Sequence, residues 1–249
     1  MADAIFEHPR LAQIYDALDP DRSDLDAYLA IAAELGAHTV LDIGCGTGTF
    51  ALLLAEHGYE VTGLDPAEAS LDVARSKPGA HRITWIHGDA TALPPRQVDL
   101  VTMTANVAQA IADPCDWAAT LVASHAGLRP GGHLVFETRD PARRAWEQWT
   151  REKTCAVTDI PGVGRVEDWN QVTNVDLPLV TFVGTCVFES DGAVLESTST
   201  LRFRDRADVA RDLAEHGFHV EDVRDAPDRP GREFVFIARA LAERAHAVG

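Results

Sequence analysis

The chain has 249 residues, 46% of them hydrophobic and 24% charged, which is enough to bury a core as one large domain or as one domain with a smaller insertion. Its 39 acidic residues against 22 basic ones give a formal charge of -17. An acidic surface repels the phosphates of nucleic acids and of anionic lipids. We therefore expect neither a nucleic-acid partner nor a membrane partner.

The cysteines are few and widely spaced: Cys45, Cys115, Cys155 and Cys186. The sequence has no CxxC pair and no histidines at metal-ligand spacing, so we predict reduced thiols and no bound metal. The first ten residues carry charges and no apolar stretch, and no run reaches the roughly 18 apolar residues of a membrane span. These features predict a cytoplasmic protein.

Strand-like and helix-like patterns alternate through the first 140 residues. Apolar, β-rich runs indicate five strands, at residues 39–43, 60–64, 82–86, 98–103 and 133–137. Helical patterns lie between them, for example at residues 50–57 and 117–128. Continuous apolar strands separated by helices predict a doubly wound, mostly parallel sheet with helices on both faces.

The two ends of the chain complete this α/β fold. An amphipathic helix at residues 24–35 is ended by Gly36, and we expect it to belong to an N-terminal helical cap over about residues 1–36. Near the other end, a helix at 205–215 precedes strands at 218–223 and 233–238. Their connection, DAPDRPGR, is too short for a parallel crossover. We therefore predict a seven-stranded sheet with a reversed last strand, in one domain over residues 1–249.

Between the fifth strand and the last helix the pattern changes to a period of two. Alternating apolar residues, with a Ser-Asp-Gly turn at 190–192, predict an antiparallel β insertion over about residues 152–204. Its position places it beside the carboxyl ends of the parallel strands, where open α/β sheets bind ligands. It can serve as a cover over a substrate or as an interface in a homodimer.

The strongest motif is VLDIGCGTGTF at residues 40–50, where the first strand turns into a helix. Gly44 and Gly46 let a ligand approach the backbone, and the helix that follows offers free N–H groups. Asp65 ends the second strand, 21 residues after Gly44, at the distance where an acidic group meets ribose hydroxyls. The alternative is that these glycines serve tight packing alone.

The details of the motif select among nucleotide-like ligands. The third position of a dinucleotide fingerprint is Thr49 rather than glycine or alanine, which disfavours NAD and FAD. Pro66 follows Asp65 where an arginine would suit a 2′-phosphate. Asp42 would sit badly near a pyrophosphate and suits a ligand with an ammonium or sulfonium charge. The pattern therefore predicts a cationic adenosyl ligand.

VLDIGCGTG, Asp65 and the Gly-Asp-Ala at 88–90 resemble the cofactor motifs of class I S-adenosylmethionine-dependent methyltransferases of the Rossmann-like, small-molecule type. The resemblance implies that Asp42 and the backbone of the glycine loop hold the methionine part, Asp65 the ribose, and Asp89 with the Ala90 backbone the adenine. A capping role is the alternative for Asp89, and ordinary packing for the aromatic Tyr15. The expected cofactor-binding residues are Tyr15, Asp42, Gly44, Cys45, Gly46, Thr47, Asp65, Pro66, Asp89, Ala90 and Asn106.

The expected substrate-binding residues are Gln109, Arg139 and Trp146. Asn106 and Gln109 are polar residues in the apolar run TANVAQAI, which by the resemblance borders the transferred methyl group; loop capping is the alternative. Arg139 can bind a carboxylate or phosphate, or pair with an acidic side chain. Trp146 can line an apolar substrate together with Trp149 and Trp169, although packing in the core is favoured.

The sequence thus predicts an enzyme that transfers a methyl group from S-adenosylmethionine to an N or O atom of a small molecule, leaving S-adenosylhomocysteine. The acceptor class follows by exclusion, and no residue is assigned as a catalytic acid or base, because alignment of the two reactants supplies much of the acceleration. The alternatives are a non-catalytic S-adenosylmethionine-binding protein and an NAD-dependent oxidoreductase.

Overall fold

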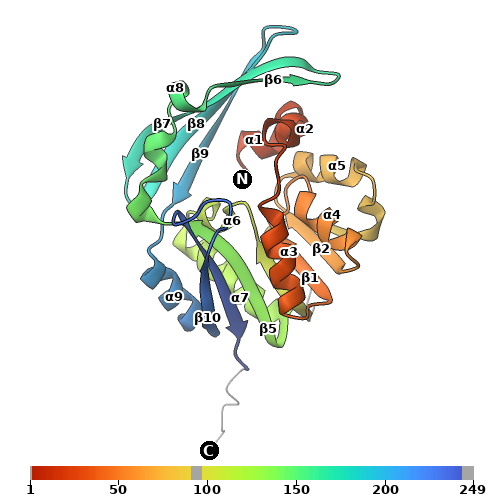
Figure 1. Cartoon of the computed structure of the whole chain (residues 1–249), viewed down its shortest axis with the longest axis vertical. Helices are drawn as coiled ribbons and strands as arrows, with labels where there is room; N and C mark the ends of the chain where they lie inside the picture. Colours follow the sequence, from red (N-terminus) through yellow and green to blue (C-terminus); the bar gives the residue numbers. More distant parts are fainter. Residues whose placement is uncertain (1, 91–96, 243–249) are drawn as a thin grey trace, which may run out of the picture.

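The computed structural model describes residues 2–90 and 97–242, which form two β-sheets with helices packed on them (Figure 1). The larger sheet has seven strands in the order β10-β11-β5-β4-β1-β2-β3, and the smaller sheet has four in the order β6-β7-β8-β9. Met1 and residues 243–249 of the predicted domain lie outside the described part of the chain.

The larger sheet confirms the predicted fold class. Its strands are β1 (Thr39–Ile43), β2 (Glu60–Asp65), β3 (Thr84–His87), β4 (Val98–Met103), β5 (Leu128–Arg139), β10 (Phe218–Asp225) and β11 (Glu233–Ala240). The first five are parallel, whereas β11 runs antiparallel to both of its neighbours, β5 and β10. The reversed strand of the predicted hairpin therefore lies inside the sheet, and β10 forms its edge.

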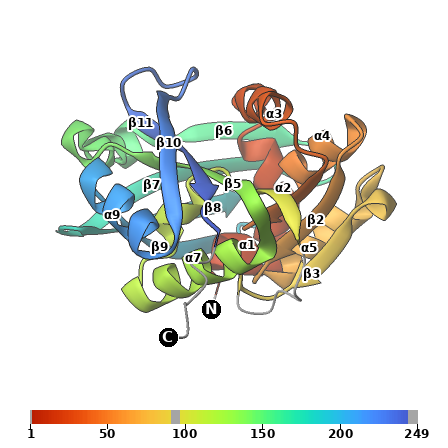
Figure 2. The same cartoon turned by 90° about the horizontal axis from the view of Figure 1, so that it is seen from below.

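Helices cover both faces of this sheet because its central strands are apolar on both sides. Every residue of β4 is buried. On one face pack α3 (Leu25–Glu34) and α4 (Thr49–Glu56), and on the other α7 (Pro114–Gly127) and α9 (Arg206–Glu215); Figure 2 shows the two pairs on opposite sides. The remaining described helices are α1 (Ala4–Glu7), α2 (Pro9–Leu18), α5 (Glu68–Ser76), α6 (Val107–Ala110) and α8 (Arg151–Thr154).

Some predicted boundaries were wrong. The strand expected from residue 82 starts at Thr84, because Ala80–Arg82 form a 3-10 turn. The strand expected from residue 133 begins at Leu128, and an irregularity in its register with β4 accommodates the intervening Arg-Pro-Gly-Gly. A local sequence pattern cannot reveal this pairing, because proline and glycine usually interrupt strands.

The smaller sheet is an antiparallel meander of β6 (Ala156–Ile160), β7 (Gly164–Asp176), β8 (Leu179–Phe188) and β9 (Val194–Arg202). In Figure 1 it lies above the larger sheet, with α1 and α2 beneath it. Leu11 and Ile14 of α2 pack on Val166 and Phe188 of this sheet. The N-terminal helices thus fill the space between the two sheets, next to the carboxyl ends of the parallel strands.

Candidate cofactor and substrate site

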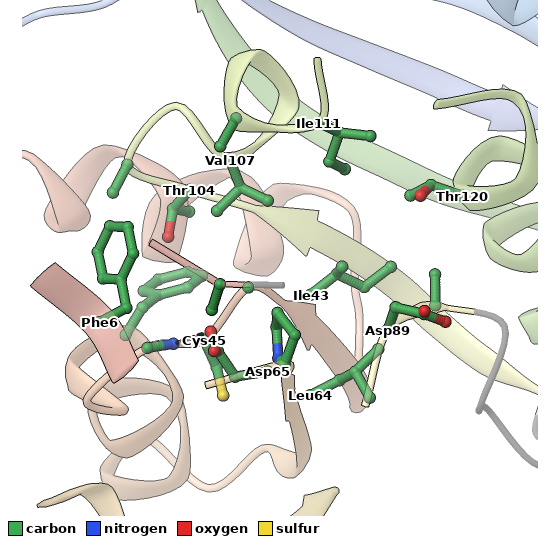
Figure 3. A pocket seen from close by; sticks show the side chains of 18 of the residues that line it. Phe6, Ile43, Cys45, Leu64, Asp65, Asp89, Thr104, Val107, Ile111 and Thr120 are labelled. Carbon is green, nitrogen blue, oxygen red and sulfur yellow. Dashed lines mark hydrogen bonds between the residues drawn. The ribbon is translucent and has the colours of Figure 1, made fainter. Parts of the chain in front are cut away.

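A cavity of about 390 Å³ lies at the carboxyl ends of β1, β2 and β4. Within the sheet, β2 is the neighbour of β1 on one side and β4 is its neighbour on the other. The strand order therefore reverses at β1, and the cavity occupies this switch point, where ligands of open α/β sheets bind. Figure 3 shows Phe6 at one end of the cavity and Asp89 with Thr120 at the other. The cavity is therefore elongated along the edge of the sheet.

Two glycines of the loop after β1 serve different purposes. Both have positive φ angles, 70° at Gly44 and 52° at Gly46. A Cβ atom on Gly44 would lie 2.5 Å from a methyl carbon of Val107, so this glycine lets α6 pack closely. A Cβ atom on Gly46 would meet nothing within 4 Å, and Gly46 lines the cavity. Gly46 thus exposes its backbone to a ligand.

The Asp65 carboxylate is fixed in the cavity wall by two backbone donors. Its Oδ2 accepts a hydrogen bond from the Gly46 N–H at 2.7 Å, and its Oδ1 accepts one from the Ala67 N–H at 2.8 Å. Burial raises the pKa of Asp65. Each carboxylate oxygen can accept a further hydrogen bond, so a ligand with adjacent hydroxyls could bind here.

Asp42 lies behind the glycine loop rather than in the cavity wall. Its Oδ1 accepts a hydrogen bond from Thr102 Oγ1 at 2.8 Å, while Oδ2 has no partner among the described residues. Burial raises the pKa of Asp42 to about 7. A buried acceptor without a partner is costly, and a positively charged group near the loop would offset that cost.

Most of the other predicted cofactor residues line the cavity: Tyr15, Cys45, Thr47, Pro66, Asp89 and Ala90. Tyr15 comes from α2, and its ring lies 5.4 Å from that of Phe6. Thr47 Oγ1 donates to Asp16, so the glycine loop is tied to α2. The N-terminal helices therefore close one side of the cavity.

Asn106 does not line the cavity, although its neighbours Ala105 and Val107 do. Ala105 and Asn106 both have positive φ angles, 57° and 62°, which are strained for residues other than glycine. The Asn106 N–H donates to Oε1 of the buried Glu137 at 2.5 Å, and its side chain donates to Glu233 at 3.4 Å. Carboxylates behind the loop thus hold its strained backbone against the cavity.

Gln109 and Arg139 are brought together outside the cofactor cavity. Gln109 Oε1 accepts hydrogen bonds from the backbone N–H of Arg139 at 3.3 Å and from its Nη1 at 3.1 Å. The Arg139 guanidinium lies 5.5 Å from the ring centre of Trp149 and 3.5 Å from Glu233. Both alternatives considered for Arg139 stay open, because it pairs with an acid and also lines a second cavity.

Trp146 takes the structural role that the sequence favoured. It is buried, and its ring lies 4.6 Å from that of Phe203. Trp149 packs on Phe182 at 5.0 Å, whereas Trp169 stacks under Arg151 at 3.9 Å. Trp149 also lies 6.1 Å from Phe203, so Trp146 and Trp149 share one cluster whereas Trp169 packs elsewhere.

Several cavity residues escaped the sequence analysis, including Phe6, Arg22, Asp116 and Thr120. Arg22 is the one basic residue among the described residues that line the cavity, and it makes a two-pronged ion pair with Asp24 at 3.0 and 3.2 Å. These four residues belong to no motif and reach the cavity only through tertiary packing. Glu137 was also missed, although a glutamate inside the apolar run HLVFET is a usable signal.

The described residues show neither a metal-binding cluster nor a membrane-spanning helix. Within residues 2–90 and 97–242, no three His, Cys, Asp or Glu side chains are grouped so that they could hold a metal ion. None of the helices in these ranges is long and apolar enough to cross a membrane.

The fold and the cavity define a doubly wound α/β protein with a nucleotide-type ligand site. Residues 40–132 match the family model described as a methyltransferase domain. A malonyl-[acyl-carrier protein] O-methyltransferase of Serratia marcescens is 34% identical over 134 residues, which are 52% of this chain and 49% of that protein. Over residues 40–132 the chain is therefore similar to methyltransferase domains, in agreement with the motifs in its sequence. It spans about half the length of the curated relatives that it matches.

Solved structures extend the likeness of fold to nearly the whole chain. An S-adenosylmethionine-dependent methyltransferase from Clostridium acetobutylicum superimposes with a TM-score of 0.76 at 18% identity, covering 94% of this chain and 99% of that one. A sugar N-methyltransferase from Streptoalloteichus superimposes with a TM-score of 0.73 at 19% identity, covering 92% of each chain. The two methyltransferase structures thus share both the larger sheet and the general plan of the molecule.

Proposed function

We propose that the chain binds S-adenosylmethionine in the cavity at the switch point and transfers its methyl group to an N or O atom of a small molecule. The observation that carries the proposal is the pairing of Gly46 and Asp65. Gly46 leaves open space over its backbone, and the Asp65 carboxylate is fixed beside it by the Gly46 N–H. This arrangement suits a ribose that lies against a glycine loop.

The cavity residues suit the three parts of the cofactor. Asp65 would accept from the ribose hydroxyls, and Asp89 with the Ala90 backbone lies at the end suited to the adenine. Tyr15 lies beside Phe6 at the opposite end, and Arg22 also lines the cavity; its guanidinium would pair with the methionine carboxylate. Asp42 behind the loop favours a ligand with an ammonium and a sulfonium charge.

The acceptor is proposed to be a small molecule for two reasons. The acidic chain disfavours a nucleic-acid substrate, and the N-terminal helices and the smaller sheet lie over the carboxyl end of the larger sheet (Figure 1). The curated relative acts on an acyl-carrier-bound malonyl group by its name, and the solved neighbour on a sugar amine. The proposal therefore includes both N and O acceptors. It also includes a homodimer and a cytoplasmic location, as the sequence predicted.

Thermal unfolding with S-adenosylmethionine, S-adenosylhomocysteine and NAD added separately tests the proposed cofactor. A ligand at 100 times its dissociation constant adds about 2.7 kcal/mol, which raises the midpoint by roughly 5 to 10 °C for a chain of this size. We expect a rise with the two adenosyl ligands and none with NAD. A rise with NAD alone would contradict the proposal. Release of S-adenosylhomocysteine with a panel of amines and hydroxyls then separates an enzyme from a non-catalytic binding protein.

A further inference from the structure

A second cavity, of about 740 Å³, lies beside the first at the carboxyl end of β5. Its walls are the two 3-10 turns after β5, Pro141–Arg143 and Ala145–Gln148, and the loop that joins β10 to β11. Four arginines line it: Arg139, Arg143, Arg229 and Arg232. In a chain with a formal charge of -17, four arginines that converge on one hollow are unexpected for an ordinary solvated surface.

The acids around this cavity leave part of its positive charge unpaired. Glu233 is the one acid among the lining residues, and it serves two arginines, Arg229 at 2.9 Å and Arg139 at 3.5 Å. Arg229 also pairs with Asp228, which does not line the cavity, at 3.0 Å. Arg143 approaches Asp140 only to 3.7 Å. The Arg232 side chain makes no hydrogen bond or ion pair with any residue that the structure describes. Arg143 and Arg232 therefore present donors that a ligand can use.

The deepest arginine of the cavity is held in a fixed orientation. The Arg139 guanidinium is oriented by Gln109 and by the ring of Trp149, and burial lowers its pKa. Glu233, which Arg139 shares with Arg229, offsets part of the cost of keeping this charge away from water. A planar guanidinium that is held in place loses little freedom when it binds a carboxylate or a phosphate.

The loop over the cavity is also fixed. The Gly231 N–H donates to both oxygens of Asp225 at 2.7 Å, and Gly231 has a φ of 70°. The carbonyl of Arg232 accepts a hydrogen bond from the Asp140 N–H at 2.8 Å, which ties the loop to the end of β5. Arg229 and Arg232 are thus placed over the cavity before any ligand arrives, which reduces the cost of ordering on binding.

The segment from Ala105 to Gln109 separates this cavity from the proposed cofactor site. Ala105 and Val107 line the cofactor cavity, while Asn106 and Gln109 contact Glu233 and Arg139 on the other side. The two cavities therefore lie on opposite sides of one short segment, and an acceptor that extends across it would have its reacting atom on the cofactor side and another group at the arginines.

We propose that this arginine-lined cavity binds an anionic group, a phosphate or a carboxylate, of the methyl acceptor. That the bound molecule is a methyl acceptor rests on the proposed function, whereas anion binding in this cavity can be tested independently of it. It narrows the acceptor to small molecules that carry an acidic group some distance from the nitrogen or oxygen that is methylated.

Isothermal titration calorimetry on the full chain tests the anion site with inorganic phosphate, pyrophosphate and malonate as separate probes, at constant ionic strength set with sodium chloride. We expect wild-type protein to bind at least one probe, and Arg232→Ala to bind it about tenfold more weakly. Arg143→Ala should show a smaller loss. Arg211→Ala is the control, because it removes the same charge from an exposed ion pair with Asp208 on α9, and we expect its affinity to equal that of wild type.

The phosphate and malonate arms identify which anion the site prefers. Heat from no probe in wild-type protein, or equal affinities in wild type and Arg232→Ala, would overturn the anion site. The titrations are run with and without S-adenosylhomocysteine. If a probe binds but S-adenosylhomocysteine gives no heat of binding, the anion site stands and the proposed cofactor is contradicted. If S-adenosylhomocysteine binds but no anionic probe does, the proposed cofactor stands and the anion site is contradicted.

Discussion

The cofactor cavity and the arginine-lined cavity lie at the same edge of one sheet, but they are encoded in the sequence in different ways. The first rests on one local stretch, residues 40–50, together with single residues at the ends of the next strands. The second gathers residues from the end of β5, two 3-10 turns and the β10–β11 loop. A local motif can therefore indicate a cofactor cavity, whereas the arginine-lined cavity depends on contacts between distant segments.

The largest expected effect belongs to the cofactor side. Gly46→Val would place a branched side chain in the open space of the cavity, at a φ of 52° that valine adopts poorly. We expect binding of S-adenosylhomocysteine to weaken by at least about 100-fold, that is about 2.7 kcal/mol, measured by calorimetry.

Gly58→Val is the matched control for this variant. Gly58 also has a positive φ, 90°, with nothing within 4 Å of a Cβ atom, and it does not line the cavity. It should lose stability and keep its affinity. Equal loss of affinity in both variants would show that backbone strain, rather than blocked space, is responsible.

The next effect concerns the proposed ribose contact. Asp65→Ala removes a charged acceptor, which is worth about 1.5 to 3 kcal/mol, so affinity for S-adenosylhomocysteine should fall roughly 10-fold to 150-fold. Because Asp65 also accepts from Gly46 and Ala67, the melting temperature of the free protein is measured alongside. An unchanged affinity would remove Asp65 from the cofactor site.

A smaller effect comes from Glu137, which supports the loop between the two cavities. Burial raises its pKa to about 7 from 4.5, so the folded state holds a proton that the unfolded state releases between about pH 4.5 and 7. This contribution to the free energy of unfolding is fully present below the unfolded pKa, and it is lost as the pH rises through the folded pKa. Each pH unit in this window changes it by at most about 1.4 kcal/mol.

Glu137→Gln should therefore flatten the pH dependence. We expect the free energy of unfolding, measured with urea from pH 5 to pH 8, to fall less with rising pH than in wild type. Glu196→Gln, at an exposed position on β9, is the control and should keep the wild-type slope. Identical slopes in wild type and Glu137→Gln would contradict the assigned burial of this carboxyl group.

The smallest effect belongs to the acceptor side. Trp149→Leu removes the aromatic face beside the Arg139 guanidinium, and a cation–π contact of this kind is worth about 0.5 to 1 kcal/mol. Anion binding should weaken a few-fold, and the affinity for S-adenosylhomocysteine should not change. A loss of affinity for S-adenosylhomocysteine would contradict the expectation that the two cavities bind their ligands independently.

The sequence by itself determined the larger sheet, the reversed strand and the class of protein. Buried parallel strands need continuous apolar runs, and a turn of eight residues cannot make a parallel crossover. The glycine loop and Asp65 were predictable for a similar reason, because a backbone that must meet a ligand requires glycine at fixed positions.

Only the tertiary structure decided which residues share the acceptor side. Asn106 and Gln109 were expected at the ligand, but they face Glu137, Glu233 and Arg139 on the far side of the loop. Arg22 enters the cofactor cavity from a segment with no motif, and Arg232 meets Arg139 only because β11 inserts between β5 and β10. The direction in which a side chain points depends on how distant segments pack, and no local pattern carries that information.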